Sequence, residues 1–108
     1  MITLTYPFRS PQSGLQWASL AFSGTSDWFA VPSCTPAISV AIHPAAGQTA
    51  RAEYTLSSPA EIEAGTAKWI PWPLGDVSAS SSDALLTMCV AIRGVASGGT
   101  AAIEVLAR

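Results

Sequence analysis

Residues 49–56, which read TARAEYTL, decide the fold class because polar and apolar side chains alternate along the whole stretch. One face would carry Ala50, Ala52, Tyr54 and Leu56, and the other Thr49, Arg51, Glu53 and Thr55. Successive side chains of a β-strand point to opposite faces, whereas those on one face of a helix recur every three or four residues. The stretch therefore predicts a half-buried strand with a polar outer face.

The same alternation recurs on either side of this stretch. Residues 38–42 precede it and are joined to it by residues 43–48, which contain a proline and a glycine. Towards the C-terminus, residues 86–92 and 101–106 alternate as well, and the turn sequence Ser97-Gly98-Gly99 lies between them. Alternating segments joined through such turn residues favour hairpins, so we expect each of these two pairs of segments to form one.

Weaker strand signals complete the pattern at residues 2–6, 15–22, 28–31 and 67–72. Proline and glycine residues separate the segments, and no long window shows the 3.6-residue period of a helix. About eight short strands predict an all-β fold, a compact antiparallel β-sandwich or jelly roll. Because the chain has 108 residues, we expect one domain over residues 1–108, with residues 1–14 as a candidate extended N-terminal arm.

One short helical turn is expected after residue 57. Ser58 is a preferred N-cap residue, Pro59 suits the first helical position, and Glu61 completes a capping box. Gly65 would end the turn after about six residues. Residues 75–83, which read GDVSASSSD, are small and polar and predict a surface loop around a short strand at Val77.

Charge is scarce throughout the chain. Five basic and seven acidic residues make up 11% of the sequence, whereas about 25% of a typical soluble domain is charged. A net charge of -2 offers no basic surface to nucleic acid or to an anionic membrane. Sheet edges and faces without charge are normally covered, so we expect assembly with sister copies or on a larger surface. The alternative is a monomer with a neutral exterior of Ala, Ser and Thr.

The chain offers little for catalysis. His43 is the only histidine and has no partner at a motif spacing, so we interpret it as a polar residue at a strand end. Glu61 and Glu63 lie two apart on the helical turn and do not face each other. The only lysine, Lys68, follows no Gly-rich phosphate loop. We therefore predict no enzymatic activity, metal, cofactor or small-molecule substrate.

The two cysteines indicate the redox compartment. Cys34 and Cys89 lie in no CxxC motif or Cys/His cluster, and the first residues show no secretory signal. We interpret both as small buried residues with reduced thiols, with a disulfide between them as the alternative. The longest mostly apolar run, residues 84–92, is much shorter than the roughly 20 residues of a transmembrane helix, so no membrane span is expected.

The aromatic residues gather in two parts of the chain. Trp17, Phe22, Trp28 and Phe29 lie in the first third, and Trp69 and Trp72 lie in the sequence AKWIPWP. Aromatic rings supply a large contact area at low entropic cost, so each group can serve as core, as a protein interface or as a platform for carbohydrate. The candidate contact residues that we select are Tyr6, Phe8, Arg9, Trp28, Phe29, Trp69 and Trp72.

Two stretches of the chain resemble a loose group of small phage virion proteins. They read AEYTLSSPAEIEAGTAKWIPWPLGDVSASSSDAL, at residues 52–85, and VAIRGVASGGTAAIEVLA, at residues 90–107. In that group a strand ends in a Tyr-Thr-Leu-like triplet, a Pro-Ala-acidic turn follows, and a Gly-Thr-Ala sequence leads into a Trp strand. A Gly-Gly-Thr-Ala sequence precedes the last strand. These features are structural turns, so the resemblance assigns no functional residue.

The resemblance implies a structural component of a tailed-phage particle, such as a capsid decoration or cement protein. We expect a non-enzymatic protein of the virion that bridges neighbouring major capsid subunits and contacts sister copies. The alternative is a binding module of a tail or fibre whose aromatic residues bind a carbohydrate or receptor. That alternative predicts a concave aromatic face flanked by exposed Asp, Asn, Gln or Arg.

Overall fold

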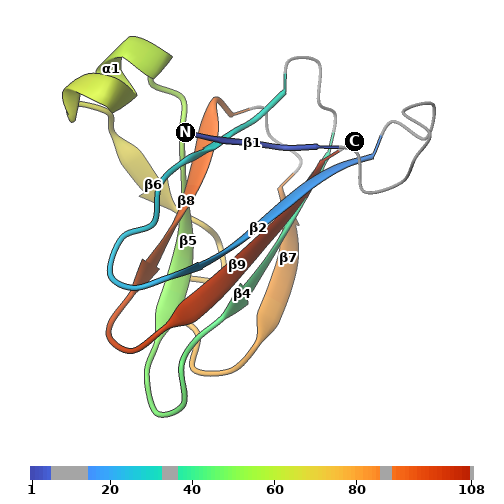
Figure 1. Cartoon of the computed structure of the whole chain (residues 1–108), viewed down its shortest axis with the longest axis vertical. Coiled ribbons are helices and arrows are strands. Elements are labelled where there is room, and N and C mark those ends of the chain that lie inside the picture. The colour runs from blue at the N-terminus through green and yellow to red at the C-terminus, as the bar shows by residue number, and fades with distance from the viewer. Residues whose placement is uncertain (6–14, 33–36, 86–88, 108) are drawn as a thin grey trace.

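Two β-sheets packed face to face form the protein (Figure 1). The computed structural model describes residues 1–5, 15–32, 37–85 and 89–107. One sheet has five strands in the order β1-β3-β8-β5-β6, and the other has four strands in the order β2-β9-β4-β7. The predicted all-β sandwich is therefore confirmed, with nine strands in these ranges rather than about eight.

The elements have the following bounds. The five-stranded sheet consists of β1 (Ile2–Thr3), β3 (Phe29–Ala30), β5 (Ala50–Thr55), β6 (Trp69–Pro71) and β8 (Ala91–Ala96). The four-stranded sheet consists of β2 (Gln16–Phe22), β4 (Ile38–His43), β7 (Ser81–Leu85) and β9 (Ala101–Ala107). The helix α1 (Pro59–Ala64) connects β5 to β6.

The strands pair as in a jelly roll. β2 pairs with β9, β3 with β8, β4 with β7, and β5 with β6, and all four pairs are antiparallel. The chain thus resembles one long antiparallel hairpin with α1 at its tip, wrapped around the core so that successive pairs enter alternate sheets. β1 adds a short parallel edge strand beside β3.

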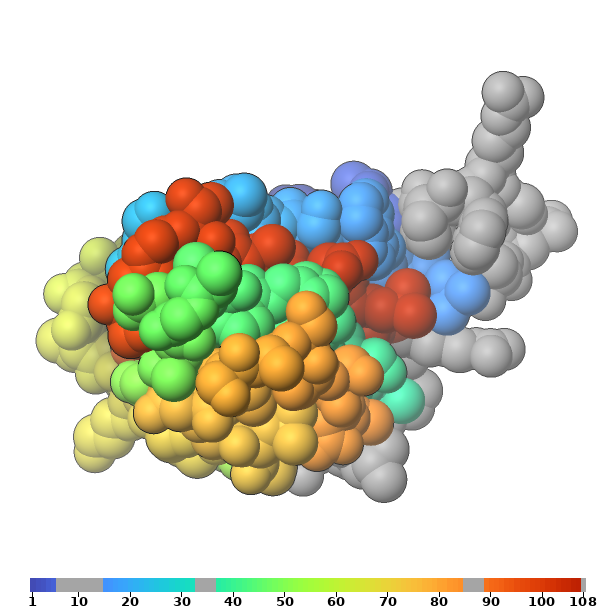
Figure 2. Space-filling model, turned by 90° about the horizontal axis from the view of Figure 1, so that it is seen from below, coloured from blue at the N-terminus to red at the C-terminus, as the bar shows by residue number. Residues whose placement is uncertain are grey.

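Both predicted hairpins are wrong. β4 and β5 lie in different sheets, and so do β8 and β9, so residues 44–49 and 97–100 cross from one sheet to the other. Alternation indicates that a strand buries one face, but both sheets bury a face in the same core, so the pattern does not tell which sheet a strand joins. Figure 2 looks onto this end of the sandwich, where the green and red crossing segments lie together. There Ser97 N donates a hydrogen bond to Thr49 O at 2.9 Å.

The segment around residue 80 also differs from the prediction. β7 occupies residues 81–85, partly inside the predicted loop, and its sequence is polar because it lies at the edge of its sheet. Val77 forms the expected short strand contact, as an isolated bridge to Ala50. The strand predicted over residues 86–92 divides between residues 86–88, which lie outside the described residues, and the start of β8 at Ala91.

The helix α1 confirms the predicted helical turn. Ser58 Oγ accepts a hydrogen bond from Glu61 N at 3.2 Å, and Pro59 is the first helical residue. Gly65 ends the helix with φ at 76°, a left-handed conformation that glycine adopts without steric cost. In Figure 1, α1 lies on the side of β6 and β8, away from the four-stranded sheet.

The core lies between the sheets and consists mainly of the inward residues of the strands. A Cβ atom added to Gly94 on β8 would lie 2.4 Å from Cζ of Phe22, so the glycine makes room for this ring. The buried hydrophobic cluster comprises Leu4, Phe22, Phe29, Ile38, Val40, Ile42, Ala50, Ala52, Trp72, Ile92, Ala96, Ala101, Ile103, Val105 and Ala107. The inward alternation predicted for Ala50 and Ala52 is thus confirmed, whereas Leu56 is exposed.

Residues 1–5 belong to the sandwich rather than to an extended arm. β1 pairs with β3, Leu4 lies in the core, and Thr5 forms an isolated bridge with Trp17. The other residues of the candidate arm, 6–14, lie outside the described residues. In the part of the chain that the structure describes, no helix is long and apolar enough to span a membrane.

Cys89 carries a free thiol that packs against the core. Burial raises the pKa of this thiol to about 11, because the thiolate would lose its hydration. The sulfur therefore stays protonated at neutral pH and is a poor nucleophile. This agrees with the predicted reduced state of Cys89, and Cys34 lies outside the described residues.

Candidate functional site

Two of the selected contact residues belong to the core. Phe29 and Trp72 are 0% and 3% exposed, and Trp72 packs edge to face against Tyr54 with the ring centroids 6.0 Å apart. A partner cannot reach either ring while the sandwich is folded, so both leave the candidate contact surface. The register of β3 with β8 explains the burial of Phe29, which lies opposite the buried Ile92. Tyr6, Phe8 and Arg9 lie outside the described residues.

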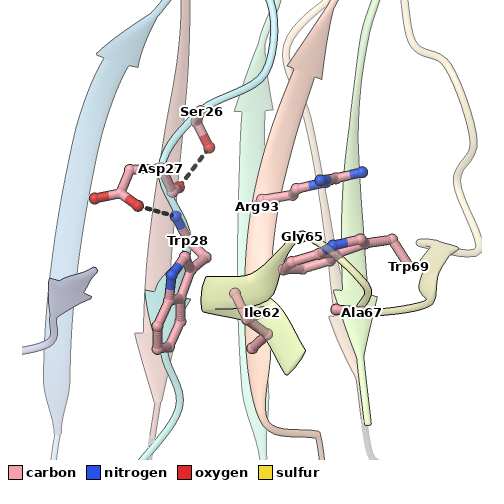
Figure 3. Close-up of a pocket in the computed structure, with 8 residues that line it drawn as sticks. All are labelled: Ser26, Asp27, Trp28, Ile62, Gly65, Ala67, Trp69 and Arg93. Atoms are coloured by element: carbon pink, nitrogen blue, oxygen red, sulfur yellow. Dashed lines mark hydrogen bonds between the residues drawn. The ribbon is translucent and has the colours of Figure 1, made fainter. Parts of the chain in front are cut away.

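Trp28 and Trp69 come together on the outer face of the five-stranded sheet. Both are half-buried, and both line a hollow of about 310 Å³ between this face and α1 (Figure 3). The residues that line the hollow are Ser26, Asp27, Trp28, Ile62, Gly65, Ala67, Trp69 and Arg93. We call it the indole hollow. The two tryptophans, forty-one residues apart in the sequence, thus share one site because Trp28 immediately precedes β3, Trp69 begins β6, and both strands belong to the same sheet.

Arg93 connects the indole hollow to the sheet beneath it. Its guanidinium lies 4.3 Å from the centroid of the Trp69 ring, a cation–π contact, as Figure 3 shows with the two groups stacked. Nε and Nη2 of Arg93 both lie 2.8 Å from Oε1 of Glu53 on the neighbouring strand. The side chain that holds Trp69 in place is therefore itself fixed by two charge-assisted hydrogen bonds.

Glu53 is a buried carboxylate on an outer sheet face. Its side chain is 7% exposed, and its second oxygen accepts a hydrogen bond from Arg51 Nε at 2.9 Å. Arg51 also reaches Asp76, with Nη1 3.3 Å from Oδ1. The polar outer face predicted for β5 therefore exists, and in it Glu53 is buried between Arg51 and Arg93, whose side chains stay 34% and 28% exposed. The charge network is the feature that the sequence analysis missed here.

Asp27 provides a fixed negative charge at the rim of the indole hollow. Its Oδ2 lies 2.6 Å from the N-terminal amine, and its Oδ1 accepts a hydrogen bond from Trp28 N at 2.9 Å. The hydrogen bond from the amine is the main cause that lowers the pKa of this carboxyl, and the Trp28 amide adds to it, while burial opposes both. Figure 3 shows Asp27 and Arg93 on two sides of the hollow.

The outer face of the four-stranded sheet has a different composition. Residues that face one another across the strands form three rows, Trp17-Leu106-Ser39-Ala84, Ser19-Glu104-Ala41-Ser82 and Ala21-Ala102-His43. We call these residues the neutral face. Apart from Trp17, Leu106, His43 and Glu104, the rows hold only alanine and serine. Glu104 is the only acidic residue in the rows.

Trp17 and Leu106 form the apolar end of the neutral face. They are 37% and 38% exposed, and together with Ser39, Ala41 and Glu104 they border a shallow hollow of about 290 Å³. The sequence of residues 15–22 did not single out Trp17 as a contact residue, because large apolar residues lie on both faces of the predicted strand. The register with β9 shows that β2 is regular and that Trp17 points away from the core.

His43 joins Glu104 to a serine on the neutral face. His43 Nε2 lies 2.7 Å from Glu104 Oε1, and Nδ1 lies 2.9 Å from Ser80 Oγ. A hydroxyl, an imidazole and a carboxylate in series are also the parts of a serine hydrolase triad. Here the imidazole and the carboxylate are 37% and 46% exposed, so water would screen the charges that develop during an acyl transfer. The arrangement suits a surface hydrogen-bond series better than a catalytic one.

The comparisons with known proteins and the search for metal ligands assign no site. Within the described ranges no three His, Cys, Asp or Glu residues lie close enough together to hold a metal ion. No protein-family model, no curated protein and no solved structure matches the chain. The candidate sites are therefore the indole hollow and the neutral face, which lie on opposite outer faces of the sandwich.

Proposed function

We propose that this chain is a non-enzymatic structural protein of a tailed-phage particle, a capsid decoration or cement protein that bridges neighbouring major capsid subunits. The observation that carries the proposal is the neutral face. It spans all four strands of one sheet, and its only ionisable side chains are His43 and Glu104, which form a hydrogen bond to each other. A sheet face so poor in charge normally packs against something.

The β7 edge of this sheet is unsuited to pairing with a strand of another protein. Asp83 on the edge strand β7 lies opposite the buried Val40 and therefore shares the inner side of the sheet, yet it is exposed. An inward-pointing charge on an edge strand prevents another strand from pairing there. The neutral face carries no comparable barrier, and its small side chains allow close approach of a second surface.

Trp17 and Leu106 supply the apolar contact area. Tryptophan is among the residue types that most often dominate interface energies, and Leu106 adds apolar contact area beside Trp17. His43 and Glu104 form a hydrogen bond to each other, so docking would bury a carboxylate that already has a partner, which limits the desolvation cost. With few charges involved, the binding is expected to depend only weakly on salt concentration.

Repetition on a lattice makes a modest contact sufficient. A protein that covers the junction between two capsid subunits must be displaced before those subunits separate, and many such junctions act together. Two further observations support the proposal: the resemblance of residues 50–107 to small virion proteins, and the jelly-roll pairing, an architecture that occurs in viral capsid proteins. The architecture is an analogy at the level of the fold and names no partner by itself.

The test is the copy number of this chain in purified particles relative to the major capsid protein, measured by quantitative mass spectrometry. We expect one copy per capsid subunit or a simple fraction of that ratio. A handful of copies per particle would assign the chain to the tail or a vertex and would overturn the cement proposal. Absence from the particles would overturn the virion proposal altogether.

A further inference from the structure

The indole hollow combines an aromatic wall with polar groups at close range. Trp28 forms one wall, and the Trp69 ring with Arg93 stacked on it forms the other (Figure 3). Asp27 and Ser26 lie at the rim, and Ile62 and Gly65 of the α1 segment line the hollow between the two tryptophans. At about 310 Å³ the hollow is at the small end of the range for ligand sites.

The charges around the hollow cancel. Arg93 is already paired with the buried Glu53, and Asp27 is paired with the N-terminal amine. An anion would meet the Asp27 carboxylate, and a cation would meet the Arg93 guanidinium, without an unpaired partner to compensate. The site therefore favours a neutral ligand.

The hydrogen-bonding groups that remain can serve a ligand with hydroxyl groups. Among the described residues, no side chain accepts a hydrogen bond from Nη1 of Arg93 or from the indole N–H of Trp28 or Trp69. The main-chain carbonyl oxygen of Asp27, which accepts a hydrogen bond from Ser26 Oγ at 2.8 Å, has a second lone pair and can accept another. Donors and an acceptor thus surround an aromatic surface.

From this arrangement we infer that the indole hollow binds one ring of a neutral saccharide. The face of an indole ring carries negative partial charge and attracts the weakly positive C–H groups on the apolar face of a sugar ring. The hydroxyl groups at the edge of the same ring then meet Arg93, Asp27 and the indole N–H groups. The hollow is too small for more than about one ring, so the rest of a glycan would extend into solvent.

The inference goes beyond the proposed assembly role and does not depend on it. The indole hollow lies on the five-stranded sheet, and the neutral face lies on the four-stranded sheet. A copy docked through the neutral face would therefore present the indole hollow outward. Failure of sugar binding would not change the expected copy number in particles. Absence of the chain from particles would not change the expected sugar binding.

The test is a nuclear magnetic resonance titration of the full chain with lactose, maltose and cellobiose as probes. The four tryptophans give separate indole N–H signals, which single Trp→Phe variants assign. We expect the signals of Trp28 and Trp69 to shift and saturate, with Kd on the order of millimolar for contact with a single ring. The signals of Trp17 and of the buried Trp72 should stay in place.

Matched variants separate the site from general effects on the protein. Trp28→Ala should weaken binding at least tenfold, and Trp28→Phe, which keeps a ring and secures the fold, should weaken it less. Trp17→Ala removes an exposed indole from the opposite sheet and should leave Kd unchanged. No saturable shift with any of the three sugars at 50 mM would overturn the inference. Equal shifts at Trp17, or binding that survives Trp28→Ala in a folded protein, would overturn it as well.

Discussion

The two sheets of this sandwich share one core but differ on their outer faces. The five-stranded sheet carries Arg51, Glu53 and Arg93, with Glu53 buried between the two arginines and Trp69 stacked on Arg93. The four-stranded sheet carries the neutral face, where the one acidic side chain, Glu104, stays 46% exposed. A glutamate is therefore buried within a charge network on one face, whereas a glutamate on the other face lies in a solvent-exposed pair.

This difference shows that the low charge of the chain is not spread evenly. Two of its basic residues and two of its acidic residues form the Asp76-Arg51-Glu53-Arg93 series on the five-stranded sheet. The other sheet is left almost without charge. One face is thus completed within the chain, whereas the other gains stability only if a second surface covers it. The composition alone predicted an assembly but did not indicate which face would make it.

Glu53→Gln is expected to have the largest effect on folding stability. The substitution leaves the guanidinium groups of Arg51 and Arg93 side by side without the carboxylate between them. Loss of one partner from a buried ion pair costs about 3 kcal/mol, which for a domain of this size lowers Tm by roughly 10 °C or more. Urea unfolding followed by tryptophan fluorescence measures this free energy.

Glu104→Gln is the matched control on the opposite sheet. It removes the same charge from a pair whose two side chains are more than a third exposed, and exposed pairs contribute only about 0.2–1 kcal/mol. If the two Gln variants destabilise the protein equally, the proposed difference between the buried Glu53 network and the exposed Glu104 pair is wrong.

The strands and the helix were predictable because they depend on local signals. Alternation identified the segments that became β4, β5 and β9, and the Ser58-Pro59 pair with Gly65 identified α1. The assignment of strands to sheets was not predictable, because it depends on crossings such as residues 97–100 that look like ordinary turns. The sequence thus indicated which faces are buried but not against which strand.

The candidate sites were only partly predictable, for the same reason. Trp28 and Trp69 were selected and do meet, but their neighbours Asp27 and Arg93 reach the indole hollow through the register of β3, β8 and β6. Phe29 was selected next to Trp28, yet adjacent residues of a strand point to opposite faces, so one ring is in the core when the other is outside. Trp17 was not selected as a contact residue. Its place beside Leu106 on the outer face depends on the register of β2 with β9, which only the structure gives.

The next largest effect on folding stability is expected from Cys89, which lies in the segment that crosses from β7 to β8. Its pKa is about 11 in the folded protein against 9.0 for an exposed thiol. The unfolded chain therefore releases this proton at lower pH than the folded one, so the contribution of the thiol to stability is complete below pH 9 and is lost as pH rises towards 11. We expect the stability difference between the wild type and Cys89→Ala to shrink across this range, as measured by unfolding at several pH values. A difference independent of pH would mean that the thiol is well hydrated.

A smaller effect is expected from His43→Ala. The pair with Glu104 is exposed, so its loss costs at most about 1 kcal/mol. If Ser80, His43 and Glu104 form only a surface hydrogen-bond series, hydrolysis of p-nitrophenyl acetate by the wild type will match that of Ser80→Ala. Saturable hydrolysis that disappears in folded Ser80→Ala or His43→Ala protein would show that the chain is an enzyme.

The last variant is expected to change folding stability least and incorporation into particles most. Trp17→Lys combined with Leu106→Lys places two charges at the exposed apolar end of the neutral face. Surface substitutions of this kind usually change the free energy of unfolding by no more than about 0.5 kcal/mol. A lysine buried in an interface without a partner is costly, however, so the variant should fail to join particles.

The comparison of the two faces supplies the control for this experiment. Ile62→Lys places a charge beside the indole hollow on the opposite side of the sandwich, and it should leave incorporation intact if the neutral face makes the contact. Incorporation measured by mass spectrometry of complemented particles distinguishes the cases. If the double lysine variant assembles normally while Ile62→Lys does not, the five-stranded sheet is the docking surface. The Arg51-Glu53-Arg93 network would then shape that surface, and the neutral face would be the exposed exterior of the particle.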